Sequence, residues 1–351
     1  MGDRVGLVYD PRFLEHETGF HPECPERLLW AVEKLGDLGL WDRCELVSPR
    51  LATPEEVALF HHPHYITRVE AFSRQGGGHF CLDTPGSAGT YRAALLAVGG
   101  VLRAIEASYT RQFEAVLCLV RPPGHHAGPT VGKGFCYFNN VAIGALWARR
   151  RFSVERTLIL DWDVHHGDGT QDAFYADPGV VYFSWHQYPF YPYTGTWEEW
   201  GAGQGFGHTV NVPLPHGGTD QEYLLAYERL LVPLARAYRP QLILVSAGYD
   251  AHFADQLGDM DVTASGFWSL AARTRDLARE LGAPLVLSLE GGYSQQGMAW
   301  GVAATVAALT GVSLEEREPF GPENTGVRPQ VEVQIEASRE KLSTIWGSSF
   351  A

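Results

Sequence analysis

The chain contains the stretch Thr157-Leu-Ile-Leu-Asp-Trp-Asp-Val-His-His-Gly-Asp-Gly169, in which an apolar run changes abruptly to aspartate and histidine. Packing alone does not explain this change, since the first part has the composition of a buried strand. Side chains two apart on an extended segment point to the same side, so Asp161, Asp163 and His165 can converge where the strand ends. We therefore expect a functional site at this edge of a sheet.

Similar apolar runs alternate with helix-like segments, which predicts a parallel sheet with helices on both faces. The expected strands are Arg4–Tyr9, Glu114–Val120, Thr157–Leu160, Gln241–Ser246 and Ala283–Leu289. The expected helices are Pro25–Leu38, Thr90–Ser108, Asn140–Arg151, Asp220–Ala237, Thr263–Leu281 and Gly297–Leu309. Irregular structure is expected at Ser184–Gly207 and after Thr310.

The length of 351 residues allows one large core and leaves little room for a second. We expect a single α/β domain over residues 1–351, with a motif-bearing core at about 4–310 and a C-terminal extension at 311–351.

The composition predicts a soluble, cytoplasmic protein that binds neither nucleic acid nor a membrane. A formal net charge of -14 repels phosphate and attracts cationic partners such as lysine-rich peptides or polyamines. No segment approaches the roughly 18 apolar residues of a membrane span. The five cysteines include no C-x-x-C pair, which argues against a disulfide frame or a thiolate zinc site. A monomer and an oligomer are both compatible with these features.

Three further strands are followed by residues that can carry chemistry. Glu114–Val120 leads into Arg121-Pro-Pro-Gly-His-His126, although an isolated histidine pair is more often an ordinary one. Another strand ends at Asp250, which by itself has even odds of being a helix N-cap, and the last leads into a Glu-Gly-Gly turn before Tyr293. Because parallel strands present their carboxyl ends at one edge, a single shared site is simpler than four unrelated features.

Asp163, His165 and Asp250 form a set of ligands suited to a catalytic metal. Zinc held by three protein ligands keeps an open position for water and a substrate carbonyl. Hard oxygen ligands also suit Fe(II), Co(II) or Mn(II), and zinc is preferred here because its open site is redox-inert.

A site with two carboxylate ligands needs a separate general base, because the carboxylates offset the charge of the metal. His125 and His126 fit this need, and Asp161 and Asp168 are the nearest carboxylates by motif that can fix their tautomers. Tyr293, on its two-glycine hinge, can stabilise the charge that develops on the carbonyl oxygen.

The motifs R-P-P-G-H-H, D-W-D-V-H-H-G-D-G, S-A-G-Y-D and E-G-G-Y together resemble the zinc-dependent histone deacetylase family, which includes bacterial acetoin-utilisation proteins and acetylpolyamine amidohydrolases. The resemblance runs from His21 to about Leu309 and implies an arginase-like α/β fold with an eight-stranded parallel sheet. It implies one catalytic Zn²⁺ and structural K⁺, and it matches the zinc ligands, histidine pair and tyrosine named above.

Further positions are assigned by the same resemblance. The K⁺ ligands match Asp161, Asp163, His165, Ser184 and Trp185. The tunnel for the acylated side chain matches Gly134, Phe135, Tyr191, Leu257 and Gly291, and Asp83 matches a residue of the rim.

Two positions bear on the branch of the family and on the substrate. Trp162 is typical of the class II and bacterial branch, whereas Asp168 stands where that branch commonly has asparagine. An aspartate there would hold a positive charge on His126 more firmly, which favours a charged His126 as an electrostatic element or acid. Leu257 stands where polyamine-selective relatives carry a glutamate, which favours acyl-lysine over acetylspermidine.

We expect a zinc-dependent amidohydrolase that removes acetyl or another acyl group from lysine side chains in peptides or proteins. An acetylpolyamine amidohydrolase, acting on a small acylated amine, is the main alternative. A binuclear manganese ureohydrolase needs more bridging carboxylates than Asp250, which is followed by Ala251 and His252, can provide. A non-catalytic acyl-lysine binder would not need the full set of ligands and bases. Cys136, beside the expected tunnel, is either a buried filler or a redox-sensitive thiol.

Overall fold

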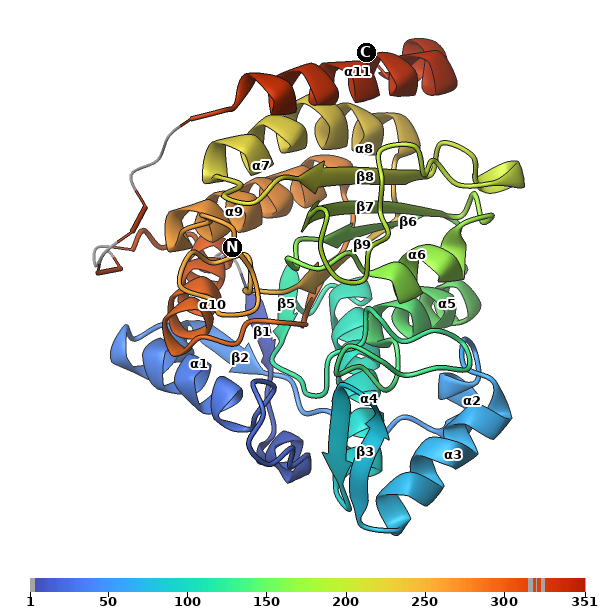
Figure 1. The fold of residues 1–351 in the computed structure, drawn as a ribbon, viewed down its shortest axis with the longest axis vertical. Helices are drawn as coiled ribbons and strands as arrows, with labels where there is room; N and C mark the ends of the chain where they lie inside the picture. Colours follow the sequence, from blue (N-terminus) through green and yellow to red (C-terminus); the bar gives the residue numbers. More distant parts are fainter. Residues whose placement is uncertain (1–3, 315–317, 320, 323–325, 351) are drawn as a thin grey trace.

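Eight parallel strands form the central sheet of this computed structural model (Figure 1). They are β1 (Val5–Val8), β2 (Cys44–Leu46), β5 (Ala115–Cys118), β6 (Thr157–Asp161), β7 (Val180–Gln187), β8 (Thr209–Leu214), β9 (Leu242–Ala247) and β10 (Leu285–Leu289). Their order across the sheet is β2-β1-β5-β10-β9-β6-β7-β8. Every neighbouring pair runs parallel, so the predicted eight-stranded parallel sheet is confirmed.

The structure describes residues 4–314, 318–319, 321–322 and 326–350. The outermost ends of the predicted domain, residues 1–3 and 351, lie outside these ranges. Within them, no helix combines the length and the apolar character needed to cross a bilayer.

Helices cover both faces of the sheet (Figure 1). They are α1 (Glu26–Asp37), α2 (Pro54–Val57), α3 (Pro63–Arg74), α4 (Thr90–Tyr109), α5 (Asn140–Phe152), α6 (Asp168–Phe174), α7 (Asp220–Ala226), α8 (Val232–Tyr238), α9 (Ala264–Leu281), α10 (Gln295–Thr310) and α11 (Pro329–Trp346). α4 and α5 pack on one face, and α1, α9 and α10 form a layer on the other. The apolar strands are therefore buried from both sides, as parallel sheets require.

The predicted irregular stretch at Ser184–Gly207 is wrong at its start, because β7 continues to Gln187. Three of the last four residues of β7 are polar (Ser184, His186 and Gln187), which hid the end of the strand in the sequence. Its buried polar groups are paired locally: the hydroxyl of Ser184 lies 2.9 Å from Nδ1 of His186, whose Nε2 lies 2.7 Å from the carbonyl oxygen of Gly195.

The predicted irregular tail after Thr310 is also wrong in part, because α11 occupies most of its second half. α11 packs on α7 beyond the β8 edge of the sheet (Figure 1). Arg328, just before α11, donates to the buried carboxylate of Glu222 in α7 at 2.5 and 2.7 Å. The sequence of α11 itself favours a helix, because Pro329 stands in its first turn and the buried residues Val331, Ile335 and Leu342 have helical spacing.

A two-stranded antiparallel hairpin stands outside the main sheet. It consists of β3 (Gly77–Cys81) and β4 (Thr84–Ser87), and it follows α3. Its turn carries Asp83, which places this carboxylate beside the loop after β5.

Candidate active site

The four strands expected to carry chemistry are the four central strands of the sheet, β5, β10, β9 and β6, lying side by side. Their carboxyl ends therefore open at one point of one edge. This is the place where ligands bind in open parallel sheets, because the loops that follow neighbouring strands converge there.

The side chains of Asp163, His165 and Asp250 converge at this point. Nδ1 of His165 lies 3.1 Å from Oδ1 of Asp163 and 3.2 Å from Oδ2 of Asp250. One ligand atom from each of the three residues lies within 4.8 Å of the others, and both carboxylates are fully buried. Gly248 and Gly291 leave room for the carboxylates, since a Cβ at either position would collide with Asp163 or Asp250.

The chemistry of this donor set fits a divalent cation. Burial, together with the neighbouring charge of Asp163, raises the pKa of Asp250 to about 7. Burial lowers the pKa of His165, but the bonds to Asp163 and Asp250 outweigh it and raise that pKa to about 9. Two buried carboxylates that compete for one proton gain much from a cation between them. Two oxygens and one imidazole nitrogen are ligands that zinc accepts.

Two histidines with their own carboxylates lie next to this cluster. The rings of His125 and His126 are 4.1 Å apart, and both are nearly inaccessible. Nδ1 of His125 lies 3.1 Å from Oδ2 of Asp161, and Nδ1 of His126 lies 2.9 Å from Oδ1 of Asp168. In each histidine Nε2 is therefore the nitrogen left for chemistry.

The charge of the pair differs from the sequence expectation. Burial and the neighbouring His125 lower the pKa of His126 to about 4, despite its bond to Asp168. Burial also disfavours a charge on His125, but the carboxylates of Asp163 and Asp161 outweigh it and raise that pKa well above its usual range. The expected charge on His126 is thus not favoured here, because desolvation outweighs a single carboxylate, and the direction of its pKa shift favours a neutral His126.

Tyr293 completes the site from the end of β10. Burial raises the pKa of its hydroxyl well above the usual value, so it remains a donor. The guanidinium of Arg27 lies 4.8 Å from the centre of the Tyr293 ring. The ring of Phe135 packs edge-to-face against it, with 5.5 Å between the two ring centres. Asp255 fixes the backbone, because its carboxylate accepts from the N–H of Tyr293 at 2.6 Å and of Ser294 at 2.9 Å.

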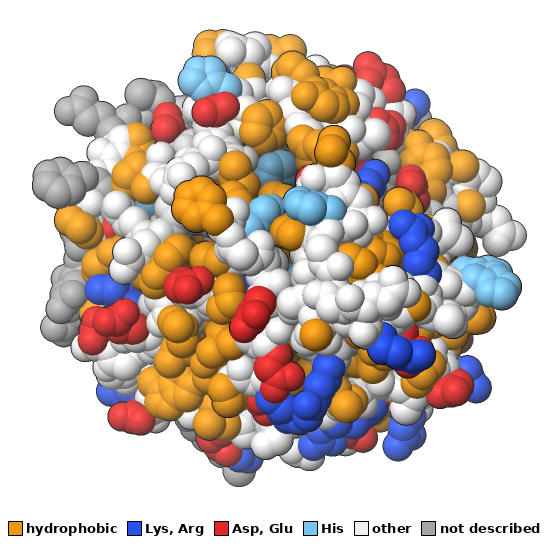
Figure 2. Space-filling model, turned by 60° about the horizontal axis from the view of Figure 1, so that its bottom comes forward, with side chains coloured by type: hydrophobic (Ala, Val, Ile, Leu, Met, Phe, Trp, Pro, Cys, Tyr) orange, Lys and Arg blue, Asp and Glu red, His pale blue; other side chains and the backbone are white. Residues whose placement is uncertain are grey.

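A pocket of about 380 Å³ leads to these groups. Its lining is Asp83, His126, Gly134, Phe135, His165, Phe190, Tyr191, Gln256, Leu257, Gly258, Asp259 and Tyr293. Four of the five expected tunnel residues are in this wall; the fifth, Gly291, lies behind it, where its N–H donates to Asp163 at 2.8 Å. Figure 2 shows histidine side chains grouped near the middle of one face of the molecule, with hydrophobic groups around them.

Asp83 joins the hairpin to the pocket wall. Its carboxylate accepts from the N–H of Gly134 at 3.2 Å and from the hydroxyls of Thr84 at 2.8 Å and Tyr191 at 3.4 Å. The expected rim residue therefore lies at the pocket, held by both the hairpin and the aromatic wall.

Of the residues expected to bind K⁺, Asp163 and His165 belong to the Asp-His-Asp cluster, and the others lie on or next to β6 and β7. Asp161 and Ser184 are paired neighbours on β6 and β7. The indole of Trp185 donates to the carbonyl oxygen of Tyr223 at 3.2 Å, and Trp185 follows Ser184 on the strand. Side chains alternate along a strand, so the side chain of Trp185 points to the opposite side from that of Ser184.

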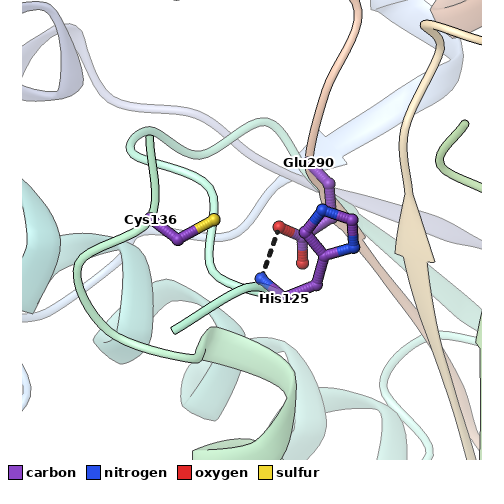
Figure 3. Close-up of side chains that lie close together, drawn as sticks. All are labelled: His125, Cys136 and Glu290. Atoms are coloured by element: carbon purple, nitrogen blue, oxygen red, sulfur yellow. Dashed lines mark hydrogen bonds between the residues drawn. The ribbon is translucent and has the colours of Figure 1, made fainter. Parts of the chain in front are cut away.

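A second group of possible ligands consists of His125, Cys136 and Glu290 (Figure 3). The carboxylate of Glu290 accepts from the N–H of Gly124 at 2.6 Å and of His125 at 3.2 Å. Burial raises the pKa of the Cys136 thiol well above its usual value. Glu290 anchors the loop that carries the histidine pair.

Sequence reasoning missed several residues of this site. Glu290 follows an apolar strand just as Asp161 does, so the same signal was available for it. Phe190 stacks on His165 at 5.4 Å and adjoins the predicted Tyr191. Asp255 and Lys133 gave no local signal, because the groups they bind are 38 and 35 residues away in the chain.

The parallel α/β fold, with a pocket that reaches paired histidines, a buried Asp-His-Asp cluster and a tyrosine hydroxyl, is what the resemblance to the histone deacetylase family implies. A family model described as histone deacetylase domain matches residues 21–309. The chain is 40% identical over 327 residues to a probable deacetylase of Archaeoglobus fulgidus, covering 91% of this chain and 90% of that protein.

Other similar proteins also carry names of deacetylases or amidohydrolases. The chain is 38% identical over 303 residues to a histone deacetylase-like amidohydrolase of Pseudomonas aeruginosa, covering 86% of this chain and 80% of that protein. It is 40% identical over 311 residues to human polyamine deacetylase HDAC10, covering 83% of this chain but only 45% of that longer protein. The crystal structure of the HDA15 HD domain superposes with a TM-score of 0.90 at 32% identity, covering 99% of this chain and 96% of that one. The chain belongs to the histone deacetylase family.

Proposed function

We propose that this protein is a zinc-dependent deacylase that removes acetyl or a related acyl group from lysine side chains. The observation that carries the proposal is the pocket itself: it is partly aromatic, and His126, His165 and Tyr293 all line it. An acylated amine that enters this pocket would bring its carbonyl to these three side chains. We further propose that residues 1–351 act as one catalytic domain around the motif-bearing core at 4–310.

Asp163, His165 and Asp250 would hold the zinc. When bound, the ion supplies a positive charge that polarises the acyl carbonyl and makes water more acidic. Asp161, Asp163, His165, Ser184 and Trp185 would hold K⁺ behind the site, where it would offset the buried negative charge of the aspartates.

The chain's own side chains would move the protons. Neutral His126, at the pocket wall, would accept the proton of the attacking water and later pass a proton to the departing amine. His125, held by Asp161, would contribute positive charge, and the Tyr293 hydroxyl would donate to the oxygen on which charge develops.

The pocket mouth bears on the choice of substrate. Leu257 presents an apolar side chain there, and the carboxylate of Asp83 already accepts from Gly134, Thr84 and Tyr191. Leu257 offers no negative charge to a cationic polyamine tail, which favours acyl-lysine, whereas the carboxylates of Asp83 and Asp259 in the same lining would attract such a tail. The acetylpolyamine activity stays the second candidate, because a relative 40% identical is a named polyamine deacetylase.

The test is turnover of a fluorogenic acetyl-lysine peptide and of acetylspermidine by zinc-loaded protein. Tyr293→Phe and His126→Ala should each lower kcat about a hundredfold or more, since one lost oxyanion donor costs about 10²–10³ in rate. Tyr193→Phe is the matched control, because Tyr193 is 74% exposed, and it should retain wild-type activity. If the protein turned over acetylspermidine but not the peptide, the proposed substrate would be an acylated polyamine instead of acyl-lysine. No turnover of either substrate by protein containing one zinc per chain would reject the proposal.

A further inference from the structure

Lys133 is placed at the catalytic histidine pair through an ion pair. Its ammonium contacts Oδ2 of Asp168, whose other oxygen, Oδ1, lies 2.9 Å from Nδ1 of His126. The three side chains therefore form a line from the half-exposed Lys133 to the buried imidazole. The sequence holds only 3 lysines beside 24 arginines, so a lysine at this position is notable.

The loop that carries Lys133 is fixed against the same histidine. Gly134 adopts a φ of +56°, and a Cβ there would collide with the ring of His126. The N–H of Gly134 is taken by Asp83 at 3.2 Å. The backbone next to Lys133 is thus held in place. This lowers the entropy cost of keeping the Lys133 side chain on Asp168.

The ionised carboxylate of Asp168 depends on Lys133 for one of its two strong hydrogen-bond donors. Asp168 is largely buried, and the bonds from His126 and Lys133 outweigh burial and hold its pKa below the usual range. Without Lys133, one oxygen of the ionised carboxylate would face the protein without a strong donor, and the carboxylate would be free to turn away from His126.

We propose that Lys133 is a positioning residue for the deacylation reaction: it holds the Asp168 carboxylate, and through it the tautomer and orientation of His126. This inference rests on the proposed function. It also explains the aspartate at 168, since an asparagine amide there would turn a donor toward Lys133 and lose the ion pair.

A double-mutant cycle tests the proposal with kcat and KM measured on the acetyl-lysine peptide. Lys133→Met should lower kcat by roughly fivefold or more with little change in KM, as the loss of a charge-assisted bond predicts. In the Asp168→Asn background the same change should alter kcat by less than about twofold, because the ion pair is already gone. Lys133→Arg should restore most of the activity, and Lys341→Met is the matched lysine control.

A second readout does not depend on turnover. The downfield imidazole N–H proton of His126, assigned by its loss in His126→Ala, should shift in the NMR spectrum of Lys133→Met and stay in place in Lys341→Met. Equal kcat losses from Lys133→Met in both backgrounds, an unchanged N–H signal, or a change confined to KM would each overturn the proposal. If the wild type turns over neither substrate, the proposed function fails, and the N–H signal still decides whether Lys133 positions His126.

Discussion

Replacing Asp255 by alanine should damage the enzyme without touching a metal ligand. The carboxylate of Asp255 accepts from three backbone N–H groups: Tyr293 at 2.6 Å, Ser294 at 2.9 Å and Leu257 at 2.9 Å. Two of these donors are buried, at the hinge that presents the catalytic hydroxyl and at the N-cap of α10. In Asp255→Ala they have no acceptor.

The expected loss of stability in Asp255→Ala follows from these hydrogen bonds. A buried donor left unpaired costs about 1–3 kcal/mol, and here there are two, while the third can bond to water. Part of the loss is offset, because burial already raises the pKa of the Asp255 carboxyl and makes its charge costly. We expect the free energy of unfolding to fall by about 2–4 kcal/mol. Displacing the hydroxyl of Tyr293 by about 1 Å should lower kcat roughly a hundredfold.

The assays are urea unfolding followed by tryptophan fluorescence, zinc content, and kcat on the acetyl-lysine peptide. Asp261→Ala is the matched control on the same loop, and it should behave as wild type in all three. Asp255→Ala should keep its zinc, because Asp163, His165 and Asp250 are unchanged. A variant within twofold of wild type in kcat and within about 0.5 kcal/mol in stability would refute the reasoning about the hinge.

Three further outcomes are expected. Gly291→Ala should lose most of its zinc and activity, because the added Cβ collides with Asp250; zinc content near one per chain would contradict this. Removing metal with a chelator should abolish turnover and lower the melting temperature, and adding zinc should restore both, since binding stabilises the folded state; a metal-free protein that keeps full activity would contradict it. Burial lowers the pKa of His61 to about 3, against about 6.5 in an unfolded chain, so the stability it contributes above pH 6.5 is lost as pH falls. The urea midpoint should drop as the pH falls from about 6.5 to 4. It should drop less in His61→Gln, because glutamine retains an acceptor for the N–H of Asn139 and cannot titrate. An equal dependence of the urea midpoint on pH in the two proteins would contradict the role given to His61.

The strands that the sequence predicted share one property: each is a short run rich in Val, Ile or Leu. Asp161, Asp163 and His165 were found because their spacing of two is a local rule of extended chains. For α11 a local signal was available, since Pro329 stands in the first turn and apolar residues follow at helical spacing. The polar end of β7 was missed because its buried polar residues find partners in a loop that follows it. Local patterns do not record such partners.

The sequence by itself determined the fold class, the family resemblance and the residues available for chemistry, because hydrophobic period, strand length and motif spacing are local quantities. Only the tertiary structure decided that β5, β10, β9 and β6 are neighbours, and therefore that their ends meet at one pocket. It also brought Asp255, Glu290 and Lys133 into the site. Burial and ion pairing act through space, and the order of strands in a sheet is not the order of strands in the chain.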